Sequence, residues 1–279
     1  MKLIVLVENN TLIDRYFRAE PGLSYFLEIE GKRILFDLGY SDLFIENARK
    51  MDIDLLNLDY LILSHSHLDH TWGLAHLISL YTEAKIEAKK YNKPLLITHP
   101  ETFNSRRVGK INQIGSLISK SRAADHFKLN LSKKHIYLTD NLVFLGEIER
   151  RNNFEAQKPI GKVLKNGKEE ADYILEDSAL AYNSPEGLII ISGCSHAGIC
   201  NIIDKAKEIF EQEKVLDIIG GFHLQNPSKE QLQGTKNYLK KLNPEAVHAS
   251  HCTDLKSKIE LAEVVEIREI GVGLEIEYK

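Results

Sequence analysis

The sequence predicts a mixed α/β protein of the α+β kind, in which a β-sheet core is covered by helices. Two observations support this class. The first forty residues contain short apolar runs separated by turns, which is typical of antiparallel strands. In the last third of the chain, apolar runs of strand length alternate with amphipathic segments of helical length, which indicates a sheet with helices outside.

The N-terminal part begins as a β-rich meander. Its predicted elements, in order, are strands at residues 3–7, 24–30 and 33–39, a helix at 41–52, a strand at 58–63, a helix at 73–91 and a strand at 94–99. A turn at Gly31-Lys32 joins the second and third strands into a hairpin, and Ser41 is a candidate N-cap of the first helix.

The rest of the chain is irregular at first and then clearly patterned. Residues 101–185 contain two strand-like runs, at 135–140 and 141–148, but form a less regular insertion overall. The predicted elements after it are strands at 187–193, 215–221, 245–251 and 273–278 and helices at 199–212, 227–242 and 255–265. No shift in composition marks a boundary, so we expect one domain over residues 1–279.

The composition argues against several classes of protein, namely nucleic-acid-binding, disulfide-rich secreted and membrane proteins. The chain has 36 basic and 40 acidic side chains, and because nucleic-acid-binding proteins usually carry a basic excess, we expect no nucleic-acid partner. Three cysteines are too few for a disulfide scaffold and fit a reducing compartment. The apolar run at residues 3–7 stops at Glu8, too short for a secretory signal or a membrane span, so we expect a cytoplasmic protein with no membrane partner.

The most informative segment is SHSHLDH at residues 64–70, which follows a predicted strand directly. In an extended chain the side chains of His65 and His67 point the same way and can bind one metal ion from one face. A turn at Leu68 would direct Asp69 and His70 to a second position nearby. Imidazole and carboxylate groups suit zinc, with iron or manganese as alternatives, so we expect one or two Zn²⁺ ions per chain.

Four more histidines lie at or just after the ends of other predicted strands. They are His99, His196, His223 and His251. In open α/β sheets, ligands gather outside the carboxyl ends of the strands. If these strand ends lie together, their histidines form one metal-lined pocket with the residue 64–70 segment.

These motifs resemble those of the metallo-β-lactamase superfamily, whose H-x-H-x-D-H signature SHSHLDH matches. Further blocks resemble a narrower group, the metal-dependent hydrolases of β-lactamase superfamily II, some of which are called dihydropterin–ribofuranosylaminobenzene 5′-phosphate synthases. The blocks are VLVENN, GLSYFLEIEGKRILFDLGYSDLFIENA, SHSHLDHTWGL, GEIERRNNFE, ISGCSHAGICN, GGFHL and HCTD. The resemblance extends over nearly the whole chain and implies a four-layer αββα sandwich.

The resemblance also implies roles for individual residues. The implied metal ligands are His65, His67, Asp69, His70, His196 and His251. Many members carry a bridging aspartate where this chain has Gly193-Cys194. Because a thiolate can bind zinc, either Cys194 or His196 supplies that ligand, and we favour His196. Asp69 is expected to orient the attacking water as well, and His223 to bind substrate or transfer a proton.

The substrate is less well defined by the sequence. Arg150 and Arg151 lie in a block that resembles a family block, and the planar guanidinium group suits a phosphate or carboxylate. We expect them to contact an anionic group, such as a phosphate, of a small-molecule substrate; the alternative is that they only form a solvated charged surface. Three functions are compatible with the motif: hydrolysis of an ester or phosphoester by a metal-activated water, condensation of a dihydropterin with a ribofuranosylaminobenzene phosphate, and non-enzymatic metal binding. The sequence does not define the oligomeric state.

Overall fold

Two α/β units make up the chain, and a computed structural model describes all of residues 1–279. Unit 1 comprises Met1–Ser132, Gly161–Asp172 and Gly271–Tyr278, and unit 2 comprises Lys133–Ile160 and Tyr173–Ile270 with Lys279. The segment 101–185, expected as an insertion, therefore contributes strands to both units.

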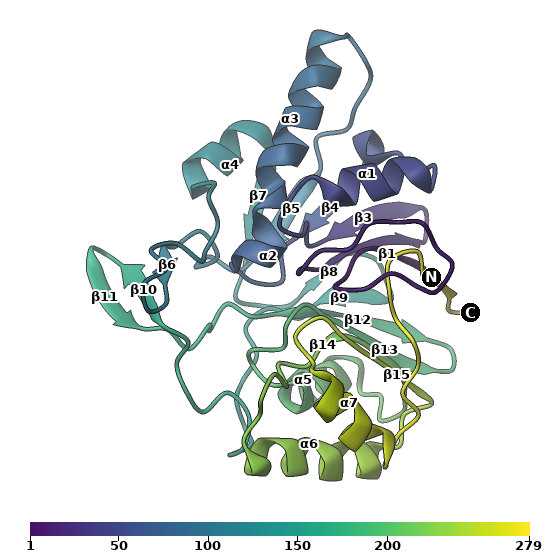
Figure 1. Ribbon diagram of the computed structural model, residues 1–279. Helices are drawn as coiled ribbons and strands as arrows, with labels where there is room; N and C mark the ends of the chain where they lie inside the picture. The colour runs from purple at the N-terminus through teal and green to yellow at the C-terminus, as the bar shows by residue number, and fades with distance from the viewer. The chain divides into compact units, whose positions relative to one another are not determined.

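The main sheet of unit 1 has seven strands. Their spatial order is β16 (Glu275–Glu277), β1 (Lys2–Val7), β2 (Ser24–Ile29), β3 (Lys32–Phe36), β4 (Tyr60–Ile62), β5 (Leu95–Thr98) and β7 (Lys128–Leu131). The pairs on either side of β1 and the β2–β3 hairpin are antiparallel, whereas β3, β4, β5 and β7 run parallel. The carboxyl ends of β3, β4 and β5 consequently lie at one edge of this sheet (Figure 1).

Helices α1 (Leu43–Lys50) and α3 (Gly73–Ile86) pack on one face of that sheet, and their apolar side chains join the core formed by β1 to β5. Burying each of these large side chains stabilises the fold by about 1.5–3 kcal/mol. The short helix α2 (Leu68–Thr71) leads into α3. At the start of α3, a Cβ on Gly73 would lie 2.2 Å from Leu38 O, so only glycine permits this close approach.

The remaining elements of unit 1 are small. They are a 3₁₀ turn at Leu55–Asn57, helix α4 (Lys120–His126) and a three-stranded sheet in the order β11 (Lys168–Ala171), β10 (Lys162–Lys165), β6 (Arg106–Arg107). Arg106 is fully buried beside this small sheet, and its Nε lies 2.8 Å from Asp172 Oδ2. The ion pair and the hydrogen bonds from Arg106 Nη1 to the carbonyls of Glu101 and Asn104 hold the 101–107 segment in place.

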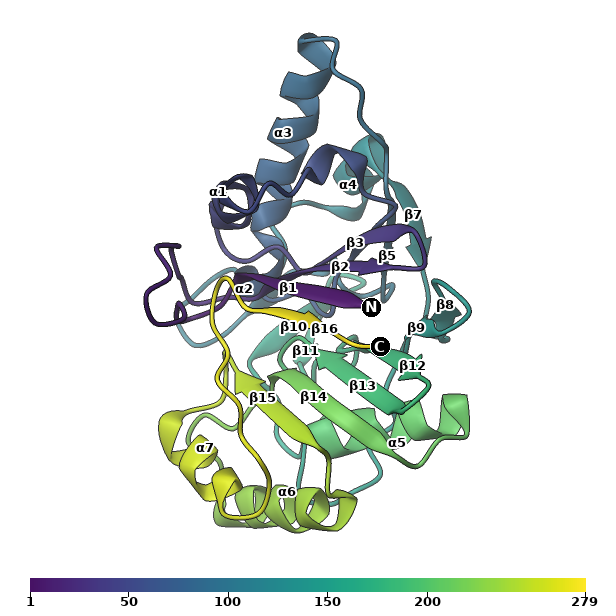
Figure 2. The ribbon, with the colours of Figure 1, turned by 90° about the vertical axis from the view of Figure 1, so that its right-hand side faces the viewer.

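Unit 2 is built on a six-stranded sheet. The strand order is β15 (Ala246–Ser250), β14 (Val215–Gly221), β13 (Gly187–Ser192), β12 (Ala179–Ser184), β9 (Leu142–Phe144) and β8 (Ile136–Tyr137). Strands β13, β14 and β15 are parallel, with Ile191 opposite Ile219 and Gly221 opposite Ser250. Figure 2 shows these strands side by side, and their carboxyl ends also share one edge.

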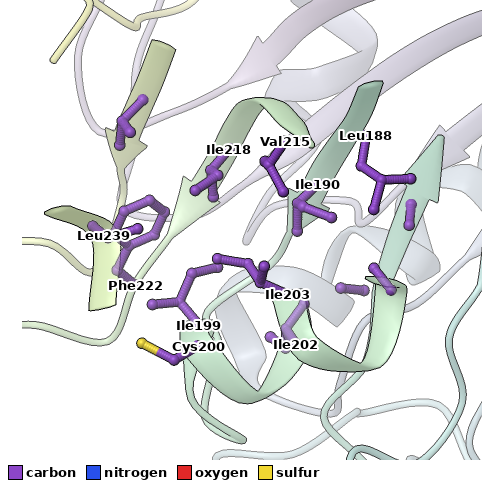
Figure 3. Packing of buried hydrophobic residues seen from close by; sticks show 14 of the residues in the cluster. Leu188, Ile190, Ile199, Cys200, Ile202, Ile203, Val215, Ile218, Phe222 and Leu239 are labelled. Carbon is purple, nitrogen blue, oxygen red and sulfur yellow. The ribbon is translucent and has the colours of Figure 1, made fainter. Parts of the chain in front are cut away.

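Three helices of unit 2 pack on its sheet. They are α5 (Ile199–Phe210), α6 (Lys229–Leu242) and α7 (Leu255–Ala262). In Figure 3, Ile199, Ile202 and Ile203 of α5 face Ile190 and Leu188 of β13 across the core. Strands β13 and β14 are mostly apolar, with Asp217 as the one charged residue of β14, which is typical of parallel strands inside a sheet.

The predicted strands and helices are largely confirmed. Two details are wrong: the helix expected at 73–91 ends at Ile86, where Ala88 adopts a left-handed φ of +56°, and Ser41 is not an N-cap, because Asp42 occupies that position without a capping bond. Ser41 instead accepts a hydrogen bond from the Leu43 amide. None of the helices is long and apolar enough to cross a lipid bilayer.

Candidate metal centre and active site

In unit 1, the candidate metal-binding residues and their hydrogen-bond partners follow the carboxyl ends of three neighbouring parallel strands. Asp37 comes directly after β3, the 64–70 segment follows β4, and His99 follows β5. Strands β3 and β4 end in buried apolar residues, and β5 ends in the buried Thr98, so the polar side chains of this group begin at one sheet edge.

Asp37 is the centre of the hydrogen bonding at this edge. Its buried carboxylate accepts hydrogen bonds from the Ser64 amide (2.7 Å) and the Ser64 hydroxyl (2.6 Å). A third bond, also 2.6 Å, joins Asp37 Oδ2 to Nδ1 of His70. The backbone of Asp37 adopts a left-handed φ of +56°, a conformation that costs free energy in a non-glycine residue and is frequent at functional sites.

This hydrogen bonding fixes the tautomers of two imidazoles. A carboxylate can only accept, so Nδ1 of His70 donates to Asp37. The Ser64 hydroxyl donates to Asp37 too, so it accepts from Nδ1 of His65 at 2.9 Å. In both rings the lone pair is therefore on Nε2, the atom that a metal ligand must present.

The donor groups of unit 1 fit a metal ion. Asp37, His65 and His70 each offer a ligand atom, and the three atoms lie within 4.8 Å of one another. The ring of His67 also lies near His65, with centroids 4.7 Å apart. Imidazole nitrogen and carboxylate oxygen are the donors preferred by zinc, and also suit iron and manganese.

The sequence predicts that a turn in the 64–70 segment separates His65 and His67 from Asp69 and His70. The structure has a turn at this point. His67 precedes α2, and Asp69 and His70 lie within that helix. The hydroxyl of Thr71 bonds to the carbonyls of Ser66 and His67 and so holds the turn. His65 lies closer to His70, at 4.3 Å between ring centroids, than to His67. Asp69 is half-buried, and its carbonyl accepts the Leu23 amide.

In unit 2, three of the predicted histidines follow the carboxyl ends of the adjacent parallel strands β13, β14 and β15. They are His196, His223 and His251. The rings of His196 and His223 are 4.3 Å apart between centroids. His223 and His251 have left-handed φ angles of +50° and +47°, as does Ser195 at +59°, so the chain turns sharply at each of these strand ends.

Cys252 lies among these histidines. Its Sγ is 3.2 Å from the His223 amide nitrogen and 3.3 Å from the Cys194 carbonyl oxygen. Burial alone would raise the pKa of the Cys252 thiol, but hydrogen bonding with Cys194 and His223 and the nearby imidazoles of His251 and His223 lower it well below its usual value. Burial would lower the pKa of His223, yet its hydrogen bond with Cys252 and the charges of Cys252 and Asp177 raise it.

The backbone beside His196 is held from two sides. Asp177 Oδ2 accepts the Ala197 amide at 2.8 Å, and Asn201 Nδ2 donates to the Ala197 carbonyl at the same distance. Asp177 is completely buried, and burial, together with the neighbouring Glu176, raises the pKa of its carboxyl group to about 8 although the Ala197 bond opposes this. His196 therefore projects from a rigid segment.

A pocket of about 460 Å³ in unit 2 includes His196 and His223 in its lining. Phe154 and Tyr173 supply aromatic surface, and Gln157 and Gln231 supply amide groups. Lys158 is the one lysine among the lining residues, and there is no arginine. The lining thus mixes apolar and polar side chains, and a concave site of this volume can hold a small molecule.

The two arginines expected to bind substrate have other contacts. Arg150 Nη2 donates to the carbonyls of Tyr173 and Ile174, at 3.0 Å for Ile174, and so braces one wall of the pocket. Arg151 pairs with Glu149 and Glu208. Neither lines the pocket, so these positions do not support direct contact with a substrate.

The sequence analysis did not identify three residues that contact the candidate site residues. They are Asp37, which bonds to His70, Asp177, which bonds to the Ala197 amide, and Cys252, which contacts His223. Asp37 had a usable signal, because FDLG places an aspartate and a glycine at the end of a buried strand, like the segments that were recognised. Asp177 lies outside any clear pattern, and only the fold brings it to Ala197.

Comparison with known proteins agrees with this fold. Residues 18–156 match the family model of the metallo-β-lactamase superfamily. The chain is 34% identical over 272 residues to 7,8-dihydropterin-6-methyl-4-(beta-D-ribofuranosyl)-aminobenzene-5′-phosphate synthase of Methanocaldococcus jannaschii, covering 92% of this chain and 89% of the relative. It is 27% identical to an uncharacterized protein of the same organism, covering 94% of each.

Among solved structures, the crystal structure of a metal-dependent hydrolase of the β-lactamase superfamily is similar at a TM-score of 0.83 and 25% identity, over 100% of this chain and 99% of the other. The fold and the family match define a metallo-β-lactamase-like α/β protein, which confirms the predicted fold class. The chain belongs to the metallo-β-lactamase superfamily.

Proposed function

We propose that this protein is a metal-dependent hydrolase that acts on an ester or phosphoester. The observation that carries the proposal is the donor set of Asp37, His65 and His70, in which a buried carboxylate orients both imidazoles for metal binding. A group of this kind at the carboxyl ends of parallel strands has no evident structural purpose, since apolar side chains would pack there at lower cost.

The proposed metal ligands are those that the family pattern suggested. In unit 1 they are His65, His67, Asp69 and His70, and in unit 2 they are His196 and His251. We propose one or two ions per chain, with zinc as the first choice. Asp37 serves as the carboxylate that orients His70, and Cys194 is the alternative to His196. A bound metal ion supplies Lewis acidity, which polarises the bond under attack and makes water a better nucleophile.

The protein side chains carry the remaining steps. Asp69 accepts a hydrogen bond from the attacking water and orients it toward the substrate. His223 donates a hydrogen bond or a proton to the leaving group. Its place in the lining of the pocket, beside His196, is compatible with this role.

A second candidate function is condensation of a dihydropterin with a ribofuranosylaminobenzene 5′-phosphate. The similarity to the synthase of Methanocaldococcus jannaschii, at 34% identity over most of both chains, favours it. The same metal ligands would serve both reactions, because a bound metal ion would act as a Lewis acid in either one.

The two functions are separated by turnover measurements on the metal-loaded protein. Hydrolysis of bis(4-nitrophenyl) phosphate or of a simple lactone, lost in His65→Ala and retained in the exposed His76→Ala variant, supports the hydrolase. Product formation from a dihydropterin and the ribofuranosylaminobenzene phosphate, with no hydrolysis of the simple esters, supports the synthase instead. Full hydrolysis by His65→Ala would contradict the proposed metal site.

A further inference from the structure

Phe154 and Gly234 are in unusually close contact in unit 2. Phe154 lines the pocket that contains His196 and His223, and Gly234 lies inside helix α6. A Cβ built on Gly234 would lie 2.5 Å from both Cγ and Cδ2 of Phe154 and 2.9 Å from Cδ1. The aromatic ring therefore occupies the space that any larger residue at position 234 would need.

The backbone of Phe154 is fixed on both sides. Asn152 Oδ1 accepts hydrogen bonds from the Phe154 amide (3.2 Å) and the Glu155 amide (2.9 Å). The buried carboxylate of Glu155 accepts the Cys200 amide at 3.1 Å, which ties this segment to the first turn of α5. Phe154 is thus held by α5 through its backbone and by α6 through its ring.

A glycine in the middle of a helix is unfavourable, because it loses more conformational freedom on folding than alanine does. Eight residues of α6 follow Gly234, so the glycine does not form a turn at a helix end, and its φ is not left-handed. Its contact with Phe154 is the feature of the structure that an alanine would disturb. We therefore infer that position 234 is a glycine because the Phe154 ring leaves no room for a side chain there.

We propose that Phe154 is the platform on which a planar aromatic or heteroaromatic ring of the substrate stacks, and that Gly234 sets the position of this platform. This assignment rests on the proposed function, because it takes His196 and His223 to mark the reacting end of the pocket. Gln157 and Gln231 belong to the same lining, and their Nε2 groups donate to backbone carbonyls, those of Asn152 and Glu155 for Gln157 and that of His223 for Gln231. Their Oε1 oxygens are the acceptors for the polar edge of such a ring. Phe154 and Gly234 are then specificity-determining residues.

The test compares two ligands that differ in the ring alone and cannot be hydrolysed: phenylphosphonate and methylphosphonate. Calorimetric titration of the metal-loaded wild-type protein should show tighter binding of phenylphosphonate. In Phe154→Leu, which keeps apolar bulk but removes the aromatic face, this preference should fall about tenfold. Gly234→Ala should lower it comparably, because the ring must move, while Asn237→Ala, an exposed change on the same helix, leaves it unchanged.

A thermal-unfolding cycle tests the contact without any ligand. Gly234→Ala should lower the melting temperature in the wild-type background and raise it in Phe154→Ala, where the added methyl group meets no ring and the helix gains a better helix former. A melting temperature raised in both backgrounds would overturn the assigned contact. Equal affinity of wild-type protein for the two phosphonates, or an unchanged preference in Phe154→Leu, would overturn the platform. Neither readout depends on turnover, so failure of the proposed hydrolysis is detected separately.

Discussion

His70 Nδ1 and Asp37 Oδ2 lie 2.6 Å apart, and both side chains are fully buried. The two residues are 33 positions apart in the sequence, and the parallel pairing of β3 and β4 brings their segments together. Because Asp37 also bonds to Ser64, which in turn bonds to His65, one carboxylate orients two of the proposed metal ligands. Carboxylates that bond to metal-binding histidines raise the basicity of the ring and fix its direction.

Replacement of this carboxylate should weaken metal binding without unfolding the protein. We expect Asp37→Asn to lower zinc affinity by about 10–100-fold, since His70 and Ser64 lose their charged acceptor. A chelator competition assay measures this, with the exposed Asp125→Asn as the matched control. Wild-type affinity in Asp37→Asn would show that Asp37 does not orient the ligands.

Removal of the Ser64 hydroxyl should have a smaller effect of the same kind. Ser64→Ala breaks the link between Asp37 and His65 but leaves the Asp37–His70 bond intact. We expect an affinity loss smaller than that of Asp37→Asn, measured in the same competition assay. In the Asp37→Asn, Ser64→Ala double variant, the two losses of zinc affinity should not add, because residues in one hydrogen-bond network are not energetically independent. Additive losses would contradict a shared hydrogen-bond network.

The stability of the small sheet in unit 1 should depend on Arg106. In Arg106→Ala, the Asp172 carboxylate remains buried without its partner, and loss of one member of a buried pair costs about 3–5 kcal/mol of unfolding free energy. Urea unfolding monitored by circular dichroism measures this change. Arg107→Ala, which removes an exposed pair with Glu169, is the control and should change stability far less. Equal effects of the two changes would contradict the assignment.

The pKa of Asp177 predicts a pH dependence of stability. Its carboxyl group has a pKa of about 8 in the fold against 3.8 as its ordinary value, so between these pH values the folded state keeps a proton that the unfolded chain has released. The free energy of unfolding should therefore fall as pH rises from about 4 to about 8, by up to about 1.4 kcal/mol per pH unit from this group. Urea titrations of metal-free protein at several pH values measure the slope.

Asp177→Asn is the informative variant for this slope. The amide keeps an oxygen that can accept the Ala197 amide proton but does not ionise. The difference in stability between Asp177→Asn and wild type should grow with pH across this range. A constant difference would mean that Asp177 does not titrate above its ordinary pKa in the fold.

The sequence predicts the fold better than the site. Strands β13 and β14 are largely apolar segments with clear ends, so their positions and the histidines that follow them could be identified without a structure. The end of α3 was missed because no glycine marks it; a left-handed Ala88 ends the helix instead. The periodicity of apolar residues does not predict such a backbone conformation.

The site residues that were missed depend on contacts between distant segments. Asp37 is recognisable as functional only once β3 pairs with β4, and Asp177 only once it reaches Ala197, 20 positions later. Arg150 and Arg151 are suitable anion ligands by residue type, and in the fold Arg150 donates to a backbone carbonyl and Arg151 to a nearby glutamate. Their contact with a substrate stays a prediction. Residue type predicts what a side chain can bind, and tertiary contacts decide what it does bind.

The central claim is that the imidazoles at the end of β4 bind a metal ion. Its most direct test is metal analysis by mass spectrometry of protein purified without chelators and then reconstituted with zinc. We predict one or two equivalents per chain, reduced in His65→Ala and His70→Ala and unchanged in the exposed His76→Ala variant. Protein that holds no metal after reconstitution, or a His65→Ala variant with full metal content, would contradict the claim.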